Sequence, residues 1–115
     1  MLDLHDREWK EFRLLDYFRH EKGNQNNMAE LRPGAFPLVS ARNANNGYKD
    51  FVSENEKKHS FEGFCLTINN DGDGGAGISY YQPCKMLLDS HVTALYPKAS
   101  MTEEILKFFS ACITA

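Results

Sequence analysis

The sequence predicts a single α+β domain, and three observations support this class. The chain has 115 residues, enough to bury one modest hydrophobic core. Several short strand-like apolar runs follow one another without regular alternation with helices. One capped amphipathic helix is expected after these strands, near the C-terminal end. No apolar run approaches the roughly 18 residues of a membrane span, and the charged N-terminal residues are unlike a signal peptide, so we expect a cytoplasmic location.

Residues 9–18 fit two local structures equally well. Trp9, Phe12, Leu15 and Phe18 recur every three residues, as in an amphipathic helix. A short strand at residues 9–12, followed by one helical turn at residues 14–18, is the alternative. Periodicity does not choose between them. The polar residues 22–27 then end any regular element and predict an exposed loop.

A β-hairpin is expected around the sequence Asn45-Asn46-Gly47. The apolar residues 36–41 predict its first strand, after a turn at residues 32–34. Asparagine and glycine tolerate positive φ, and Asn-Gly is typical of a tight primed turn between two strands. Residues 48–52 supply the return strand, with Tyr48 and Phe51 as its apolar anchors. Residues 53–60 predict a solvated loop or a short helix.

Three further strands and a helix complete the domain. Residues 61–69 alternate most clearly, with Phe64, Leu66 and Ile68 expected on one side and Cys65 and Thr67 on the other. Residues 78–82 and 92–96 predict two more strands, each followed by a proline.

The sequence Ser100-x-x-Glu103 has the pattern of a capping box, so we expect a helix to begin there. Its expected apolar positions are Ile105, Leu106, Phe108, Phe109 and Ile113.

Three cysteines argue against both a disulfide framework and a zinc site. Cys65, Cys84 and Cys112 are odd in number and far apart, and the chain has no C-x-x-C pair. Cys65 and Cys112 lie in apolar sequence and are expected to be buried thiols.

The net charge of −3 counts against an extended nucleic-acid surface, because phosphate contacts come mainly from lysine and arginine. Residues 32–50 are an exception. They contain Arg32, Arg42 and Lys49 but only one acid, which predicts a weakly basic face on an acidic body.

Residues 69–77 read NNDGDGGAG and resemble two known ligand loops only in part. Gly72, Gly74 and Gly77 form a literal G-x-G-x-x-G, but the residues that follow favour a strand, whereas a dinucleotide site needs a helix there. The acidic spacing imitates a calcium loop, yet its twelfth position is Tyr80 rather than glutamate. The four histidines have no ligand spacing, and no nucleophile motif occurs. We therefore expect no metal, no cofactor and no catalytic site.

These polar loops are better suited to binding. Backbone amides of a glycine-rich turn form concavities that suit anions, and asparagine can pair with adenine in the major groove. Arg42 and Lys49 would add positive charge beside them. Such loops allow binding of DNA or RNA, but also of a glycan or a protein partner.

Motifs along nearly the whole chain resemble the target recognition domain of restriction–modification specificity subunits, as found in type I systems and the related type IIG and IIB enzymes. They are, in order, WKEFRLLDYF at residues 9–18, GAFPLVSARNANNG at 34–47, FCLTINNDGDGG at 64–75, VTALYPK at 92–98 and FFSACI at 108–113. The PLVSA…NNG piece and the DGDGG piece at residues 71–75 are the most specific.

The resemblance implies a non-catalytic module that recognises one half of a bipartite DNA target. Methylation and cleavage would belong to methyltransferase and nuclease partners. It also implies an α+β fold with a twisted, partly curled mixed sheet, a few short helices, and a strand plus a helical turn in the first segment. The residues expected at DNA are Ser40, Arg42, Asn45, Asn46, Gly47, Lys49, Asn70, Asp71, Gly72, Asp73 and Gly74.

Two departures from the family pattern supply an alternative. Relatives usually continue beyond the closing FFSACI with more sheet and a long helix, so residues 1–115 are expected to form one recognition domain shortened at its C-terminus. The acidic charge also weakens the case for DNA. The alternative is a vestigial or regulatory module that associates with a methyltransferase subunit or with itself. A nucleotide-dependent enzyme ranks third.

Overall fold

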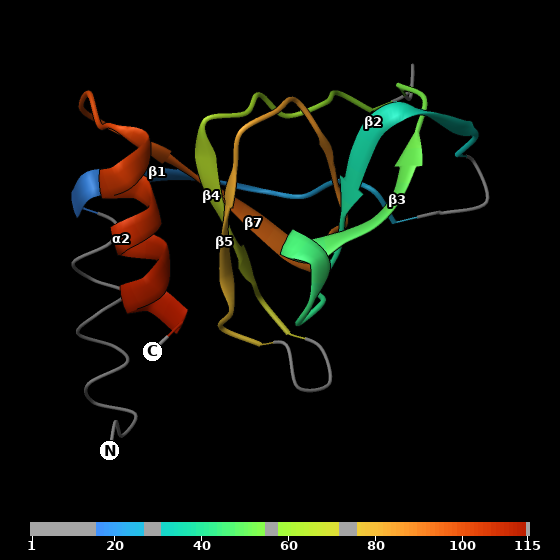
Figure 1. Cartoon of the computed structure of the whole chain (residues 1–115). Helices are drawn as coiled ribbons and strands as arrows, with labels where there is room; N and C mark the ends of the chain where they lie inside the picture. Colours follow the sequence, from blue (N-terminus) through green and yellow to red (C-terminus); the bar gives the residue numbers. More distant parts are fainter. Residues whose placement is uncertain (1–15, 27–30, 55–57, 72–75, 115) are drawn as a thin grey trace.

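The strands form two sheets, and one helix packs beside them. The computed structural model describes residues 16–26, 31–54, 58–71 and 76–114. Figure 1 shows the helix on one side, the larger sheet in the middle and the smaller sheet on the other side, which confirms the α+β class. In order, the elements are β1 (Phe18–Lys22), β2 (Pro33–Val39), the 3-10 turn η2 (Asn45–Gly47), β3 (Tyr48–Val52), β4 (Cys65–Asn69), β5 (Ser79–Gln82), β6 (Leu87–Leu88), β7 (Val92–Pro97) and α2 (Glu103–Thr114).

The larger sheet is antiparallel, with the strand order β1-β7-β4-β5. Its central strand β4 is buried on both faces. Leu66 packs toward α2 with Leu106, whereas Cys65 packs with Val39 and Met86 on the opposite side. The predicted alternation in β4 therefore separates two hydrophobic clusters rather than a core from solvent. Phe64, expected on the apolar side, lies outside the strand with φ +56° and is 46% exposed.

The smaller sheet has the order β3-β2-β6, and its β2–β3 pair is the expected hairpin. β6 pairs with β2 in parallel and was not predicted. The register of the hairpin shifts between Leu38 and Val39, where Lys49 is the extra residue of β3. Such a bulge bends and twists the strand locally.

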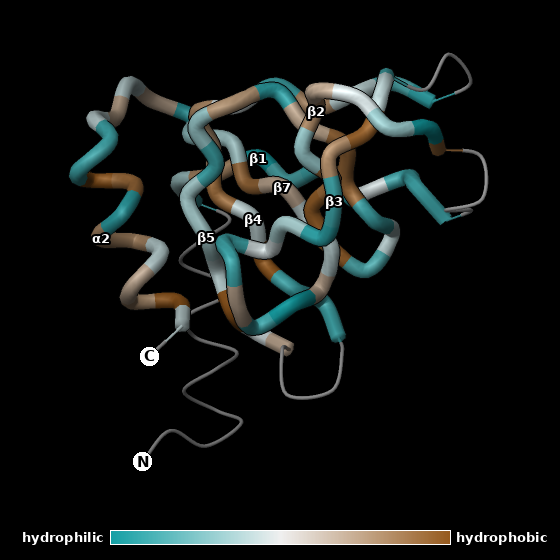
Figure 2. Tube along the Cα trace, turned by 45° about the vertical axis from the view of Figure 1, so that its right-hand side comes forward, coloured by the Kyte–Doolittle hydropathy of each residue, from teal (hydrophilic) through white to brown (hydrophobic). Residues whose placement is uncertain are grey.

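Helix α2 covers the larger sheet, with Leu106 fully buried. Figure 2 shows it alternating between hydrophobic and hydrophilic residues along its length. The hydroxyl of Thr102 accepts a hydrogen bond from the Ile105 N–H at 3.2 Å. The expected cap at Ser100 is therefore wrong, because the helix begins at Glu103 and its N-cap is the residue before. Phe108, an expected core position, is 65% exposed.

The outer edge of β5 is covered by side chains, which blocks pairing with another strand. Ser110 Oγ donates to the Ser79 carbonyl at 2.9 Å, and Thr114 Oγ1 accepts from the Ser79 N–H at 3.0 Å. The Asn46 amide donates to the Tyr81 carbonyl further along the same edge. The edge strand is thus tied to both the helix and the 3-10 turn.

Of the two cysteines expected to be buried, only one is. Cys65 is buried as expected, but Cys112 is exposed because it lies on the outer side of α2. Phe18 begins β1, and residues 9–15, for which a helix and a strand were weighed, lie outside the described residues. In the part of the chain that the structure describes, no helix is long and apolar enough to cross a membrane.

Candidate nucleic-acid interface

Three connections meet at one end of the two sheets. They are residues 40–47 between β2 and β3, residues 70–78 between β4 and β5, and residues 89–91 between β6 and β7. We call the first two the first loop and the second loop. Both leave the sheets at the lower side of Figure 1. The antiparallel pairing of Asn69 with Val92 and the hydrogen bond from the Asp89 N–H to the Val39 carbonyl place these strand ends side by side.

A hydrogen bond joins the first two loops directly. Asn69 lies at the end of β4 and is 2% exposed, and its Nδ2 donates to the Arg42 carbonyl at 2.9 Å. The two segments expected at DNA are therefore neighbours, although β3, β4 and the connection between these strands separate them in the sequence. Sequence reasoning did not single out Asn69 as the link.

The first loop turns through a series of positive φ angles. Asn45, Asn46 and Gly47 have φ of 56°, 57° and 79°. The Ser40 N–H donates to the Gly47 carbonyl at 2.9 Å, which closes the loop at its base. The connection is therefore longer than the tight primed turn expected from Asn-Gly, although the residues do use the predicted left-handed conformation.

The amide of Asn46 is occupied inside the protein. Its Nδ2 donates to the Tyr81 carbonyl at 3.0 Å and to Gln82 Oε1 at 3.3 Å. The carbonyl of Asn46 accepts from Gln82 Nε2 at 3.0 Å, and Gln82 is 1% exposed. Ser40 and Gly47 are also buried. Three residues expected at DNA thus shape the loop, and Gln82, which sequence reasoning missed, supports it.

Arg42 and Lys49 are exposed cations beside the first loop. Arg42 Nη1 donates to the Tyr48 carbonyl at 2.8 Å, which orients the guanidinium while leaving most of its five donors for another group. Among the described residues, neither cation forms an ion pair. Asn45 is exposed at the tip of the same loop.

The second loop is held at its stem. The Asn70 N–H donates to the His91 carbonyl at 2.8 Å, and Thr93 Oγ1 donates to Asn70 Oδ1 at 2.8 Å. Asp71 Oδ1 lies 2.9 Å from His91 Nδ1, and both side chains are exposed. In the sequence, His91 is one of four histidines without ligand spacing; only its position directly before a strand connects it with this end. Gly72, Asp73 and Gly74, expected at DNA, lie outside the described residues.

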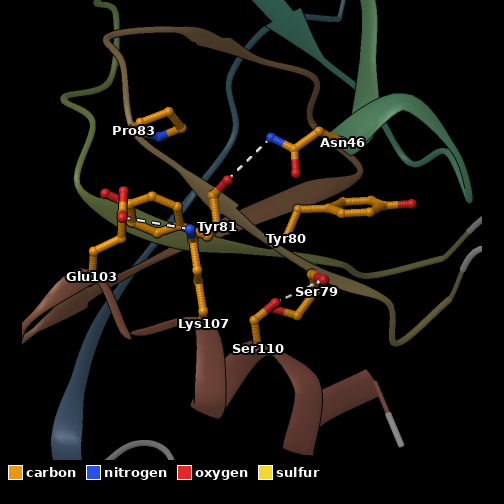
Figure 3. Close-up of a pocket in the computed structure, with 8 residues that line it drawn as sticks. All are labelled: Asn46, Ser79, Tyr80, Tyr81, Pro83, Glu103, Lys107 and Ser110. Carbon is orange, nitrogen blue, oxygen red and sulfur yellow. Dashed lines mark hydrogen bonds and ion pairs between the residues drawn. The ribbon is translucent and has the colours of Figure 1, made fainter. Parts of the chain in front are cut away.

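A groove of 460 Å³ lies between α2 and β5, beside the first loop (Figure 3). Lys107 pairs with Glu103 at 3.4 Å and lies 5.7 Å above the ring of Tyr81. The positive charge in the groove is therefore already balanced. The lining residues are Asn46, Ser79, Tyr80, Tyr81, Pro83, Glu103, Lys107 and Ser110.

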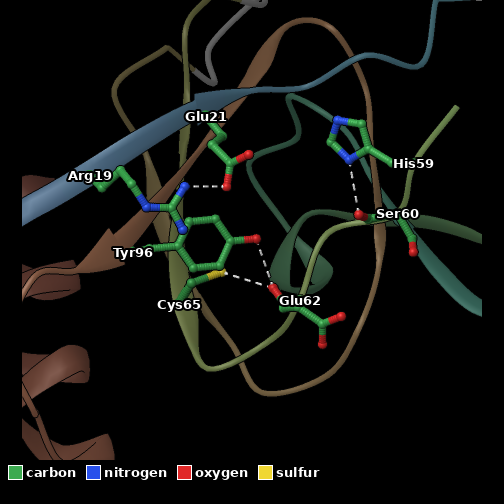
Figure 4. A network of polar contacts seen from close by, with 7 residues as sticks. All are labelled: Arg19, Glu21, His59, Ser60, Glu62, Cys65 and Tyr96. Carbon is green, nitrogen blue, oxygen red and sulfur yellow. Dashed lines mark hydrogen bonds and ion pairs between the residues drawn. The ribbon is translucent and has the colours of Figure 1, made fainter.

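A second polar network lies at the opposite end of β4 (Figure 4). Tyr96 Oη and Cys65 Sγ both donate to the Glu62 carbonyl, at 3.0 and 3.6 Å. Burial raises the pKa of the Cys65 thiol to about 12 and also raises the pKa of Tyr96. A buried, protonated thiol is a poor nucleophile, so this network stabilises the fold rather than supplying a reactive cysteine. Within the described ranges, no cluster of three or more His, Cys, Asp or Glu residues could hold a metal ion.

Comparisons with known proteins agree with the motif pattern. No family model matches the chain. It is 29% identical over 92 residues to S.BcgI, a type II restriction enzyme specificity subunit from Heyndrickxia coagulans, and the match covers 80% of this chain and 26% of that subunit.

The fold matches the solved structure of a type I restriction–modification S subunit from M. genitalium. The TM-score is 0.63 at 23% identity, over 88% of this chain and 25% of that one. The chain thus spans about a quarter of the length of each relative. The resemblance predicted from the motifs is confirmed: the chain is similar, in sequence and in fold, to part of the specificity subunits of restriction–modification systems.

Proposed function

We propose that this chain is a non-catalytic, sequence-specific DNA-binding module of a restriction–modification system. It recognises part of a bipartite target, while partner subunits or domains carry out methylation and cleavage. The observation that carries the proposal is the hydrogen bond from Asn69 to the Arg42 carbonyl, which joins two polar loops at one end of the fold. That fold is shared with part of a specificity subunit.

Two kinds of contact are available at this end. Arg42 and Lys49 contact phosphates and position the duplex, since they are exposed and have no acidic partner among the described residues. Asn45 and Asn70 contact base edges. Because Asn70 Oδ1 is held by Thr93, its Nδ2 is oriented and has no hydrogen-bond partner in the described part of the protein. Ser40, Asn46 and Gly47 contribute by holding the loop in shape.

The test begins with selection from a pool of random-sequence duplexes, because the target is unknown. An enriched sequence is the expected result, and its affinity should fall steeply with salt because phosphate neutralisation releases counterions. The double variant Arg42→Glu, Lys49→Glu should weaken binding and reduce the slope of log affinity against log salt by about two.

Lys98→Glu is the matched control. Lys98 follows β7 at the opposite end of the sheet, so the same charge change there should leave binding nearly intact. Failure to enrich any sequence, or equal losses from Lys98→Glu and from each of the single variants Arg42→Glu and Lys49→Glu, would contradict the proposal.

One observation favours the alternative of a protein-interaction module. Ile105 and Phe108 on α2 are 44% and 65% exposed, and large exposed apolar side chains are common where proteins dock. Under this alternative, Phe108→Ser would abolish association with a methyltransferase subunit or with a second copy. Under DNA recognition, the same variant would leave the selected duplex bound as before. Sedimentation and duplex titration of the same sample separate the two.

A further inference from the structure

We propose that His91 is a DNA-contacting residue and that Asp71 is its positioning residue. This rests on the proposed function and adds a contact from the connection between β6 and β7. From the sequence alone, Asp71 itself is predicted to lie at DNA, and no pattern indicates a role for His91. The two side chains face each other across neighbouring strand ends, which only the fold brings together.

The backbone around His91 is fixed on both sides. Its N–H donates to Asp89 Oδ1 at 2.8 Å, and its carbonyl accepts from the Asn70 N–H at 2.8 Å. The Val92 N–H donates to the Asp89 carbonyl at 3.0 Å. These hydrogen bonds fix the backbone that carries the imidazole, although the side chain itself is 60% exposed.

Asp71 fixes the orientation of the ring. His91 Nδ1 lies 2.9 Å from one carboxylate oxygen of Asp71 and 3.1 Å from the other. A carboxylate on Nδ1 keeps the proton there, which leaves Nε2 as the nitrogen that meets a ligand. An exposed pair of this kind contributes only about 0–1 kcal/mol to stability, so folding alone gives little reason for it.

The position of the pair matches the proposed interface. Asn70, whose amide is oriented by Thr93, is covalently next to Asp71 and bonded to the His91 backbone. Through Asn69, the same strand end is bonded to the Arg42 carbonyl. Side chains from all three connections thus share one end of the sheets. A lone carboxylate there would repel phosphate, whereas a carboxylate occupied by an imidazole presents a hydrogen-bonding ring instead.

The ligand chemistry is a hydrogen bond between Nε2 and the DNA. A neutral ring accepts from the exocyclic amine of cytosine or adenine in the major groove. A protonated ring donates to a phosphate oxygen. The two contacts predict different effects of removing the ring. Loss of a base contact lowers the preference for one base pair of the target, whereas loss of a phosphate contact lowers the affinity for all sequences alike.

The test uses the 115-residue chain and the duplex enriched from the random pool. Affinity is measured for His91→Ala, Asp71→Ala and the double variant, against the selected duplex and a panel with each base pair replaced in turn. His91→Ala should weaken binding roughly five- to a hundredfold. Asp71→Ala should weaken it in the same direction, and the double variant should lose no more than His91→Ala, because Asp71 acts through the ring.

The sign of the Asp71→Ala effect is decisive. If Asp71 only repels phosphate, its removal will tighten binding, and the inference is overturned. Asp71→Asn, which keeps an acceptor oxygen for Nδ1–H, should retain more affinity than Asp71→Ala. His20→Ala, an exposed histidine on β1, is the matched control and should leave binding unchanged. Thermal melting of each variant shows that it is folded.

The outcomes also separate this inference from the proposed function. If the wild type binds the selected duplex and Arg42→Glu weakens it while His91→Ala does not, the inference fails and the proposed function stands. If the wild type enriches no sequence, the proposed function fails and the inference fails with it.

Discussion

The two polar loops have similar composition but are built in different ways. In the first loop the side chain of Asn46 turns inward and bonds to Tyr81 and Gln82 on the edge strand β5. Among the described residues of the second loop, Asn70 and Asp71 bond to residues of β7 and of the turn before it. The first loop is thus bonded to a neighbouring edge strand, whereas the described part of the second loop is bonded to the strand end beside it.

This difference shows that polar residues in a loop have two distinct uses. Asn45 and Asn46 are adjacent, share nearly the same positive φ and are indistinguishable by composition. Yet Asn45 is exposed, whereas Asn46 is half-buried and hydrogen-bonded to the sheet. The fold of the neighbouring strand decides which asparagine is structural and which is available to a ligand.

The largest effect should come from Gly47→Val in the first loop. Gly47 has φ 79°, and a Cβ there would lie 3.1 Å from Val39 Cγ1 and 3.4 Å from the Tyr80 ring. Left-handed strain and crowding together should cost roughly 2–4 kcal/mol of unfolding free energy, measured by urea denaturation. The control is Asn43→Val, at an exposed position of the same loop, which should change stability by about 0.5 kcal/mol or less. Equal losses at both positions would show that the loop is not held as described.

A loss of stability smaller than that of Gly47→Val is expected from Asn46→Ala, with Asn45→Ala as its matched control. Both substitutions place alanine at a φ near 57°, so the strain of the left-handed conformation cancels in the comparison. Only Asn46→Ala also leaves the Tyr81 carbonyl and Gln82 Oε1 without this donor. It should therefore be less stable than Asn45→Ala by about 1–3 kcal/mol. In duplex binding, Asn45→Ala should lose the preference for particular base pairs of the selected sequence, because Asn45 is proposed to contact a base edge. If the two variants prove equally stable, the inward hydrogen bonds of Asn46 contribute nothing measurable to the free energy of unfolding.

Replacing threonine by valine in the adjacent strands β4 and β7 distinguishes the hydrogen bonds that support the first loop from those that support the second. Thr67 is buried and its Oγ1 accepts from Gln82 Nε2 at 3.3 Å, so Thr67→Val should cost about 1–2 kcal/mol. Thr93 donates to Asn70 at an exposed site, so Thr93→Val should cost about 0.5 kcal/mol or less. Thr93→Val should nevertheless weaken binding of the selected duplex, because the Asn70 amide loses its orientation. A large stability loss from Thr93→Val would mean that the second loop is as strongly built into the fold as the first.

The smallest effect on stability and binding at neutral pH is expected from a substitution of Cys65, at the end of β4 opposite the two loops. Burial raises the pKa of Cys65 from 9.0 to about 12, so the folded state keeps its proton where the unfolded chain loses it. This contribution to stability is complete below pH 9 and is lost as the pH rises toward 12. Cys65→Val should flatten the alkaline decline in denaturation midpoint and leave duplex binding unchanged at pH 7. A decline as steep as that of the wild type would assign the alkaline loss to another group, such as Tyr96.

The parts of the fold that sequence predicted well are those set by local pattern. The hairpin of β2 and β3 follows from two apolar runs around positive-φ residues, and β5 and β7 follow from their apolar residues and the prolines near their ends. Helix α2 was expected, but its N-cap is Thr102 rather than Ser100. Ser100 and Thr102 lie close together before acidic residues, and serine and threonine can each cap a helix. β6 consists of Leu87–Leu88 alone, too short to show periodicity.

For the candidate site, the sequence predicted which residues could bind but not which side chains are free to do so. Arg42, Lys49 and Asn45 are exposed as that role requires. Ser40, Asn46 and Gly47 are buried or half-buried, because β5 lies against the first loop. His91 could not be found from spacing, since its partner Asp71 is brought near by the pairing of β4 with β7.

The α+β class, the left-handed bend at Asn45-Asn46-Gly47 and the family resemblance can be predicted from the sequence, because each depends on residues close together or on ordered motifs. The meeting of the two loops through Asn69, the inward position of Asn46 and the contact of Asp71 with His91 depend on tertiary contacts. Those contacts join residues on different strands. Their geometry depends on strand order and register, which the packing of both hydrophobic clusters fixes only once the whole chain has folded.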